Sequence, residues 1–145
     1  MAKINPHLLF KGNTEEAFNF YKSVFGGEFV MIMRLKDLPS DPNNPISESE
    51  GNKIMNIALP IGKSNILMGS DVAEQFMDQE LVTGNRYTIA ISAESKEEAE
   101  NIYNGLSADG FIEIPLAESH WGSYFGMFAD KYGIQWMIDF DPKYN

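Results

Sequence analysis

The chain contains no cysteine among its 145 residues. Disulfide bridges, thiol catalysis and zinc–thiolate sites are therefore excluded. The lack of cysteine is compatible with a reducing compartment, and we expect a cytoplasmic location. Histidine is scarce as well, because His7 and His120 are the only two. Any chemistry that depends on an imidazole must use one of them.

Basic residues are also few. Lys and Arg together number 11 against 21 Asp and Glu, which gives a net charge of −10 and a pI of about 4.5. Nucleic acids and anionic membranes attract basic patches, so we expect neither as a partner. The polar start of the chain predicts no signal peptide, and no apolar run is long enough to span a membrane.

Hydrophobic residues make up 43% of the chain and charged residues 22%, a globular composition that fits one domain over residues 1–145. The clearest internal feature is a repeat. Asn13–Tyr21 reads NTEEAFNFY, and Ser95–Tyr103, shifted by 82 positions, reads SKEEAENIY. Asn13 and Ser95 can each cap a helix, and a Glu three residues later completes a capping box. Two such matching segments indicate two related structural units.

Apolar residues follow both caps at helical spacing, which predicts helices over residues 14–25 and 96–107. Both helices run into glycine, at Gly26-Gly27 and at Gly110, and we expect a left-handed residue there to end each helix.

Alternating or β-rich segments flank the helices. Strands are predicted at Ile4–Lys11, Glu28–Lys36, Lys53–Pro60, Ser64–Gly69, Arg86–Ala93, Phe111–Ala117, Ser123–Ala129 and Ile134–Phe140. Leu38–Gly51 is predicted to be a loop, and Asp71–Val82 a link between halves. The order βαβββ therefore occurs twice, in modules of about 1–70 and 84–145. We expect an α+β fold in which each sheet packs one face on its helix and the free faces enclose a cavity.

Two long stretches resemble a known family: Phe10-Lys11-Gly12-Asn13 leading into EEAFNFYKSVFGGE, and the run HWGSYFGMFADKYGIQWMIDF from His120 to Phe140. They resemble the vicinal-oxygen-chelate superfamily of glyoxalases, extradiol dioxygenases and bleomycin-resistance proteins, and more closely its PhnB-like branch. The resemblance implies two βαβββ modules, usually assembled as a homodimer. Some relatives are described as ubiquinone-pathway methyltransferases, but this chain has no glycine-rich strand-to-helix loop to hold such a cofactor.

The resemblance also implies where a divalent metal would bind, on the first and last strands of each module. The matching positions here are Thr88 and Met137 in the second module. In the first they are Asn5 or Pro6 and Leu67 or Met68, depending on a register uncertain by one residue. None offers the His, Gln or Glu donor that family enzymes use, and Asn56 stands where PhnB-like relatives often have His. We therefore predict no metal site and no cofactor.

The candidate ligand-binding residues are those that strand alternation turns toward the free faces, together with an aromatic cluster near the sixth strand. They are His7, Asn56, His120, Trp121, Tyr124, Gln135 and Met137. Asn56 interrupts the apolar run IMNIAL and needs hydrogen-bond partners if buried. Trp136 alternates with Ile134 and Ile138, so we expect it to pack under a helix.

These features favour a metal-independent binder of a small hydrophobic or aromatic molecule that forms a homodimer. One alternative is a metal-dependent lyase or dioxygenase with a non-standard site. Another is an enzyme without metal, in which His7 or His120 acts as a general base.

Overall fold

The computed structural model describes residues 2–43, 45–72 and 81–143. It divides the chain into two compact units, Met1–Leu81 and Val82–Asn145, here called the first and second modules, and each is described by itself. Part of the predicted link at Asp71–Val82, residues 73–80, lies outside the described residues. No helix in the described ranges has the length and apolarity needed to cross a membrane.

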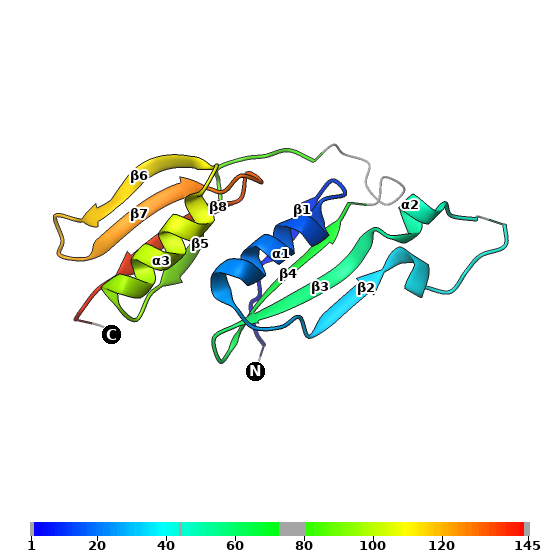
Figure 1. Ribbon diagram of the computed structural model, residues 1–145, viewed down its shortest axis with the longest axis horizontal. Helices are drawn as coiled ribbons and strands as arrows, with labels where there is room; N and C mark the ends of the chain where they lie inside the picture. The colour runs from blue at the N-terminus through cyan, green and yellow to red at the C-terminus, as the bar shows by residue number, and fades with distance from the viewer. Residues whose placement is uncertain (1, 44, 73–80, 144–145) are drawn as a thin grey trace. The chain divides into compact units, whose positions relative to one another are not determined.

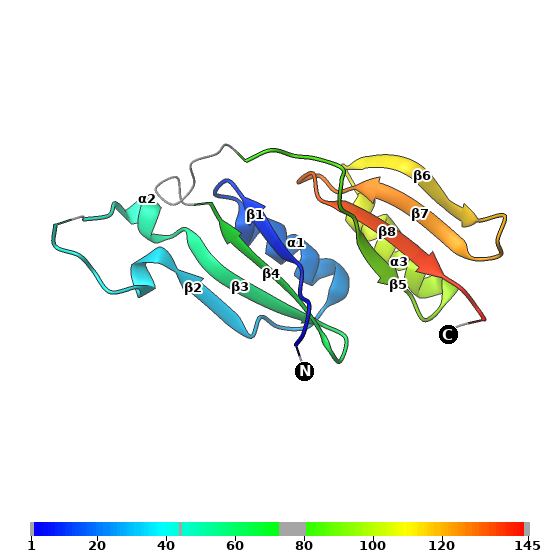
Figure 2. The same ribbon diagram turned by 180° about the vertical axis from the view of Figure 1, so that it is seen from behind.

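The first module has the predicted βαβββ order (Figure 1). Its strands form one mixed sheet in the order β1-β4-β3-β2, with β1 parallel to β4 and the other pairs antiparallel. The helix α1 crosses one face of this sheet, as the two opposite views show (Figures 1 and 2). The elements are β1 (His7–Phe10), α1 (Thr14–Phe25), β2 (Met31–Arg34), the 3-10 turn η1 (Leu35–Asp37), α2 (Glu48–Gly51), β3 (Ile54–Ile61) and β4 (Asn65–Asp71).

The second module repeats this pattern. Its sheet order is β5-β8-β7-β6, with β5 parallel to β8, and α3 packs on one face. The elements are β5 (Ile89–Ser92), α3 (Lys96–Ser107), β6 (Phe111–Glu118), β7 (Tyr124–Ala129) and β8 (Gln135–Phe140). The α+β class and the paired βαβββ modules predicted from the repeat are confirmed.

Each module has a core between its helix and its sheet. Aromatic and aliphatic side chains fill both because one face of every strand alternates toward the helix. The fully buried residues include Phe18, Tyr21, Ile57 and Leu59 in the first module and Leu106, Phe128, Trp136 and Ile138 in the second.

Several predicted strands are shorter in the structure. The first begins at His7 rather than Ile4, whose side chain is 99% exposed. The second covers only Met31–Arg34, because η1 follows directly. The predicted loop at Leu38–Gly51 was wrong at its end, where Ser47 accepts a hydrogen bond from the Glu50 N–H and caps α2.

The two helix starts differ although their sequences match. Ser95 accepts a hydrogen bond from the Glu98 N–H, and Glu98 in turn accepts one from the Glu94 N–H. The side chain of Asn13 makes no capping bond, so the predicted capping box is wrong in the first module. The N–H of Thr14 is bound by the carboxylate of Asp71 instead, from the end of β4. A contact between distant segments has replaced a local one.

The helix ends also differ. Gly26 has φ 79° and donates its N–H to the Lys22 carbonyl, as predicted. In the second module the left-handed residue is Asp109, with φ 60°, and not Gly110. Gly110 is needed for a different reason, since a Cβ there would lie 2.2 Å from the carbonyl oxygen of Ala129 on β7.

Candidate functional site

The face of the first sheet turned away from α1, here called the first open face, carries two of the predicted residues. Gly69 defines the helix side, because a Cβ on it would collide with the ring of Phe18 on α1. Its neighbour Met68 therefore points the other way, and so does His7, its partner on β1. The same alternation places Ser70, Ala58 and Asn56 on the first open face.

His7 and Ser70 form the polar contact of this face. The imidazole Nε2 lies 3.0 Å from the hydroxyl oxygen of Ser70, and the His7 side chain is exposed. Depending on its tautomer, His7 donates to or accepts from the hydroxyl. In either state the ring is oriented by Ser70 while its other nitrogen remains available to a ligand.

Asn56 lies on the inner strand β3, opposite Met33 of β2. Extending the β3–β4 register by one residue places Ser70 on its other side. Asn56 is half-buried, and its Oδ1 atom is shielded from solvent with no hydrogen-bond partner among the described residues. The first open face thus carries a row of three polar side chains, from His7 through Ser70 to Asn56, bordered by methionines.

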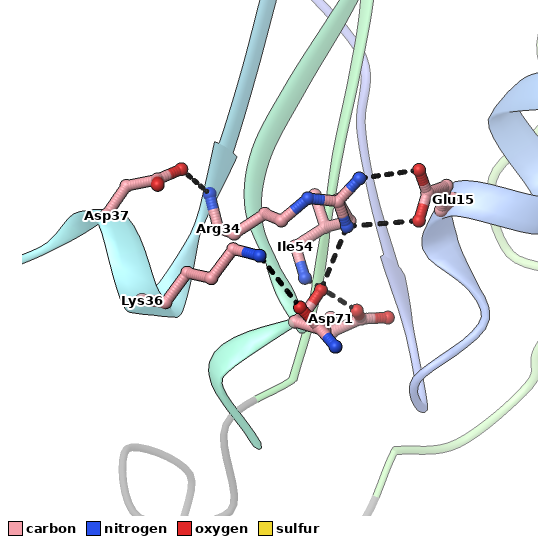
Figure 3. A network of polar contacts seen from close by, with 7 residues as sticks. Glu15, Arg34, Lys36, Asp37, Ile54 and Asp71 are labelled. Atoms are coloured by element: carbon pink, nitrogen blue, oxygen red, sulfur yellow. Dashed lines mark hydrogen bonds and ion pairs between the residues drawn. The ribbon is translucent and has the colours of Figure 1, made fainter. Parts of the chain in front are cut away.

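Asp71, next to Ser70, anchors this end of the sheet (Figure 3). Its Oδ1 accepts hydrogen bonds from the N–H and hydroxyl of Thr14, at 3.1 and 2.6 Å. Its Oδ2 accepts from the N–H of Ile54 at 2.9 Å, and the residue is only 6% exposed. One carboxylate thereby joins β4 to the start of α1 and the start of β3, which fixes the backbone beside Ser70.

Arg34 extends the network toward the protein surface. Its guanidinium donates two hydrogen bonds to Glu15, at 3.0 and 2.6 Å (Figure 3). It donates a third to the carbonyl of Asn52. The Arg34 guanidinium holds the pKa of the Glu15 carboxyl below its usual value, mainly by hydrogen bonding; burial opposes this, and the charge of Arg34 adds a smaller lowering effect. These contacts tie both ends of the 35–53 segment to α1.

The second open face, turned away from α3, carries Gln135 and Met137. Phe128 defines the helix side, because its ring packs edge-on against Tyr103 of α3 at 5.6 Å. Trp136 is the strand partner of Phe128 and is 1% exposed, which confirms its predicted burial under a helix. Its indole N–H donates to Asp130 at 2.8 Å. Gln135 and Met137 flank Trp136 and therefore face away from α3.

Trp121 joins this second open face through an aromatic pair. Its ring packs edge-on against Phe125 at 5.7 Å, yet Trp121 is 65% exposed. His120 and Trp121 occupy the turn between β6 and β7, which Ser119 closes by hydrogen bonds to Ser123. The turn presents an indole and an imidazole to solvent on a braced backbone.

Tyr124 points elsewhere. Its hydroxyl donates to the carboxylate of Glu100 on α3 at 3.1 Å, and the ammonium group of Lys96 lies 4.9 Å from its ring. Partial burial, and next the bond to Glu100, raise the pKa of the Tyr124 phenol above its usual value. The structure thus places His7 and Asn56 on the first open face, puts Gln135 and Met137 on the second with Trp121 at Phe125 beside them, and gives Tyr124 a helix partner.

Sequence reasoning missed three residues that the structure brings to these groups: Ser70, Asp71 and Phe125. Ser70 and Asp71 lie just beyond the predicted strand Ser64–Gly69, which continues to Asp71 in the structure. Phe125 lies three residues before the buried Phe128 on β7, so strand alternation places it on the opposite face.

The positions of the usual family metal now have a defined register. Leu67 is 2% exposed on the helix side, so Met68 is the residue that faces outward. Thioether and hydroxyl groups at Met68, Met137 and Thr88 are poor ligands for the divalent cations such sites hold. Over residues 2–43, 45–72 and 81–143, no three His, Cys, Asp or Glu side chains are grouped to hold a metal ion. The side chains at these positions do not fit a divalent metal ion, and no reaction step is assigned to one.

Comparison with known proteins supplies the family. A family model described as 3-demethylubiquinone-9 3-methyltransferase matches residues 2–139. The chain belongs to this family. One solved relative, from Bacillus cereus, is described as a PhnB protein, the branch that the sequence resembles. Structures of glyoxalase-related and bleomycin-resistance proteins, 14–18% identical with TM-scores of 0.57–0.63, share the fold alone.

Three relatives of this PhnB-like protein are similar over almost their full length. Protein PA1353 from Pseudomonas aeruginosa is 31% identical, with a TM-score of 0.80 over 97% of this chain and 98% of its own. A putative 3-demethylubiquinone-9 3-methyltransferase, PhnB protein, from Bacillus cereus is 27% identical, with a TM-score of 0.75 over 96% and 99%. Protein YjdN of Escherichia coli strain K12 is 26% identical over 94% and 93%.

The methyl transfer in the family's description would require a methyl-donor cofactor. Nucleotide-type cofactors are commonly held where a glycine-rich loop joins a parallel strand to a helix. Here β1 and α1 are joined by Lys11-Gly12-Asn13 and β5 and α3 by Ala93-Glu94-Ser95, so the two connections contain one glycine between them. These connections do not fit such a cofactor, and no methyl-transfer step is assigned to the residues of this chain.

Proposed function

We propose that this PhnB-like protein binds a small, planar, mainly apolar molecule without a metal ion. The observation that carries the proposal is the composition of the open faces. The first offers methionines around His7, Ser70 and Asn56, and the second offers Met137 and the Trp121–Phe125 pair. Sites for small organic molecules typically combine such apolar surface with a few polar groups. Methionine sulfur also packs favourably on aromatic rings.

We propose each open face as a ligand-contacting surface by itself, with His7 and Asn56 on the first, and His120, Trp121, Gln135 and Met137 on or beside the second. The proposal does not rely on Tyr124, because its phenol is bound to Glu100. The absence of cysteine supports a cytoplasmic location for such a binder, as expected from the sequence.

A thermal-shift panel tests the proposal. Planar aromatic compounds should raise the melting temperature in buffer that contains EDTA, because a ligand that binds only the folded state stabilises it. Zinc, nickel and manganese alone should leave the melting temperature unchanged. Co-purification of stoichiometric metal, together with loss of ligand binding or of a measurable turnover when that metal is removed, would refute the metal-free binder. That result would favour a metal-dependent lyase or dioxygenase.

Trp121 provides a second readout. An exposed indole next to a bound ring should be quenched, whereas Trp136 is buried under α3 and should not. Trp121→Phe keeps an aromatic ring against Phe125 and should abolish the ligand-induced quenching. Trp136→Phe is the matched variant and should retain it.

The contact between His7 and Ser70 favours a second candidate, a metal-free reaction in which His7 is the general base. An oriented imidazole with one free nitrogen is the arrangement such a base requires. His7→Gln would then lower a measured rate by roughly 100-fold or more, while His120→Gln would not. In a binder, His7→Gln weakens affinity by the equivalent of one hydrogen bond, about 1 kcal/mol.

We also propose that the protein is a homodimer. Both sheets end on an edge strand with exposed apolar side chains. On β2 these are Met31 at 47% and Ile32 at 43%, and on β6 Phe111 at 67% and Ile114 at 44%. Edge strands of this kind are usually covered in the native assembly. Light scattering at micromolar concentration should give twice the chain mass of 16.3 kDa, and a monomer would refute the dimer.

A further inference from the structure

Asn56 stands out on the first open face because its carboxamide oxygen has no hydrogen-bond partner among the described residues. It lies on the inner strand β3, between Met33 of β2 and the position of Ser70 on β4. Its Oδ1 is shielded from solvent and unbonded in the described part of the chain. The hydroxyl of Ser70 is already engaged with His7 at 3.0 Å.

Such an amide is unfavourable in the unliganded protein. A polar atom removed from water without a replacement hydrogen bond destabilises the folded state. The rest of this strand is apolar, and Ile54, Ile57 and Leu59 are all buried. A leucine at position 56 would avoid the free-energy cost of an unbonded carboxamide oxygen. The unbonded oxygen of Asn56 therefore indicates a ligand that supplies the missing hydrogen-bond donor.

We infer that the ligand carries a hydrogen-bond donor next to an acceptor on a planar ring, as in a cyclic amide, and that this edge pairs with the carboxamide of Asn56. The inference rests on the proposed function and names its ligand class. A carboxamide presents one acceptor and one donor in a plane. Asn pairs in the same two-bond manner with the donor–acceptor edge of adenine. Oδ1 is shielded in this structure, so the carboxamide turns about its χ2 angle on binding. An N–H of the ligand then donates to Oδ1, and the Nδ2 group donates to the adjacent carbonyl.

The surrounding residues suit the rest of such a molecule. Met33 and Met68 border Asn56 and Ser70 with thioether groups, which pack on ring faces. The net charge of −10 favours a neutral ring over an anionic one. His7 and Ser70 remain beside the ring to contact a further substituent.

Isothermal titration in EDTA buffer with 2-quinolone, 1-methyl-2-quinolone and naphthalene tests the inference. The methyl group replaces the N–H donor and leaves the carbonyl acceptor, so wild-type protein should bind 2-quinolone about tenfold or more tightly than its methylated form, as expected for one lost buried hydrogen bond. Asn56→Leu should bind both quinolones equally and should unfold at a higher temperature. Asn65→Leu, at the exposed start of β4, is the matched control and should keep the preference.

The outcomes separate the two proposals. If none of the three compounds binds wild-type protein, the proposed function fails and the inference fails with it. If the compounds bind but wild type does not distinguish the quinolones, or Asn56→Leu keeps the preference, the inference alone is wrong.

Discussion

Replacing Asp71 by Ala should destabilise the first module more than any exposed substitution. The carboxylate is 6% exposed and accepts three hydrogen bonds, two from Thr14 and one from the N–H of Ile54. Its removal leaves these donors buried and unpaired, at about 1–3 kcal/mol each before water enters the gap. Allowing for partial rehydration, we expect a loss of about 3–5 kcal/mol, the range found when one partner of a buried charged contact is removed.

The assay is urea unfolding followed by far-UV circular dichroism, because both tryptophans, Trp121 and Trp136, belong to the second module. Asp71→Asn keeps one acceptor for Thr14 and should lose less than Asp71→Ala. Glu113→Gln, on the exposed strand β6, changes the net charge by the same unit and is the control. If Asp71→Ala costs no more than Glu113→Gln, the carboxylate does not hold β4 to α1, and the account of this network is refuted.

Three further predictions test single contacts within the modules. Gly110→Ala should be destabilising by about 3 kcal/mol or more through backbone overlap, whereas Gly84→Ala, with open space around it, should be neutral in thermal unfolding. Ser95→Ala should lower the free energy of unfolding by about 1 kcal/mol because a helix cap is lost. Asn13→Ala should leave it nearly unchanged because the Asn13 side chain makes no capping bond, and equal losses in urea unfolding would contradict this difference. The pKa of Glu15 is lowered by its arginine partner, so the stabilisation is present above the usual value of 4.5 and is lost as the pH falls through the lowered value. The free energy of unfolding of the wild type should therefore exceed that of Glu15→Gln by about 0.2–1 kcal/mol at neutral pH, and the two values should converge in acid. A difference that does not depend on pH would argue against the ion pair.

Much of the fold could be predicted because local patterns determine it. Helical spacing and strand alternation gave both modules, and the limits of both helices agree with the structure. The details that were wrong depend on distant contacts. Asn13 has the sequence of a helix cap, but the carboxylate of Asp71, at the end of β4, accepts the hydrogen bond from the N–H of Thr14 at the start of α1. Gly110 looks like a helix stop, but the close approach of β7 is what requires it.

The candidate site was less accessible to sequence reasoning. Alternation turned His7 to the more polar side of its strand, whereas Asn56 was chosen because a buried amide in an apolar run needs hydrogen-bond partners. Ser70 was missed because its neighbour across the sheet depends on the β1–β4 register, which a single sequence does not reveal. Tyr124 was taken as part of an aromatic cluster, and only its distance to Glu100 shows that it faces α3.

The central claim is that the first open face binds a planar molecule without metal, and ¹H–¹⁵N NMR tests it most directly. Protein dialysed against EDTA would be titrated with 2-quinolone while the amide signals of His7, Met68, Ser70 and Asn56 are followed. The account predicts saturable shifts at these amides and at the Asn56 side-chain amide, unchanged when EDTA is replaced by zinc, nickel or manganese. No shifts in EDTA, with shifts appearing only after one of these metals is added, would contradict it.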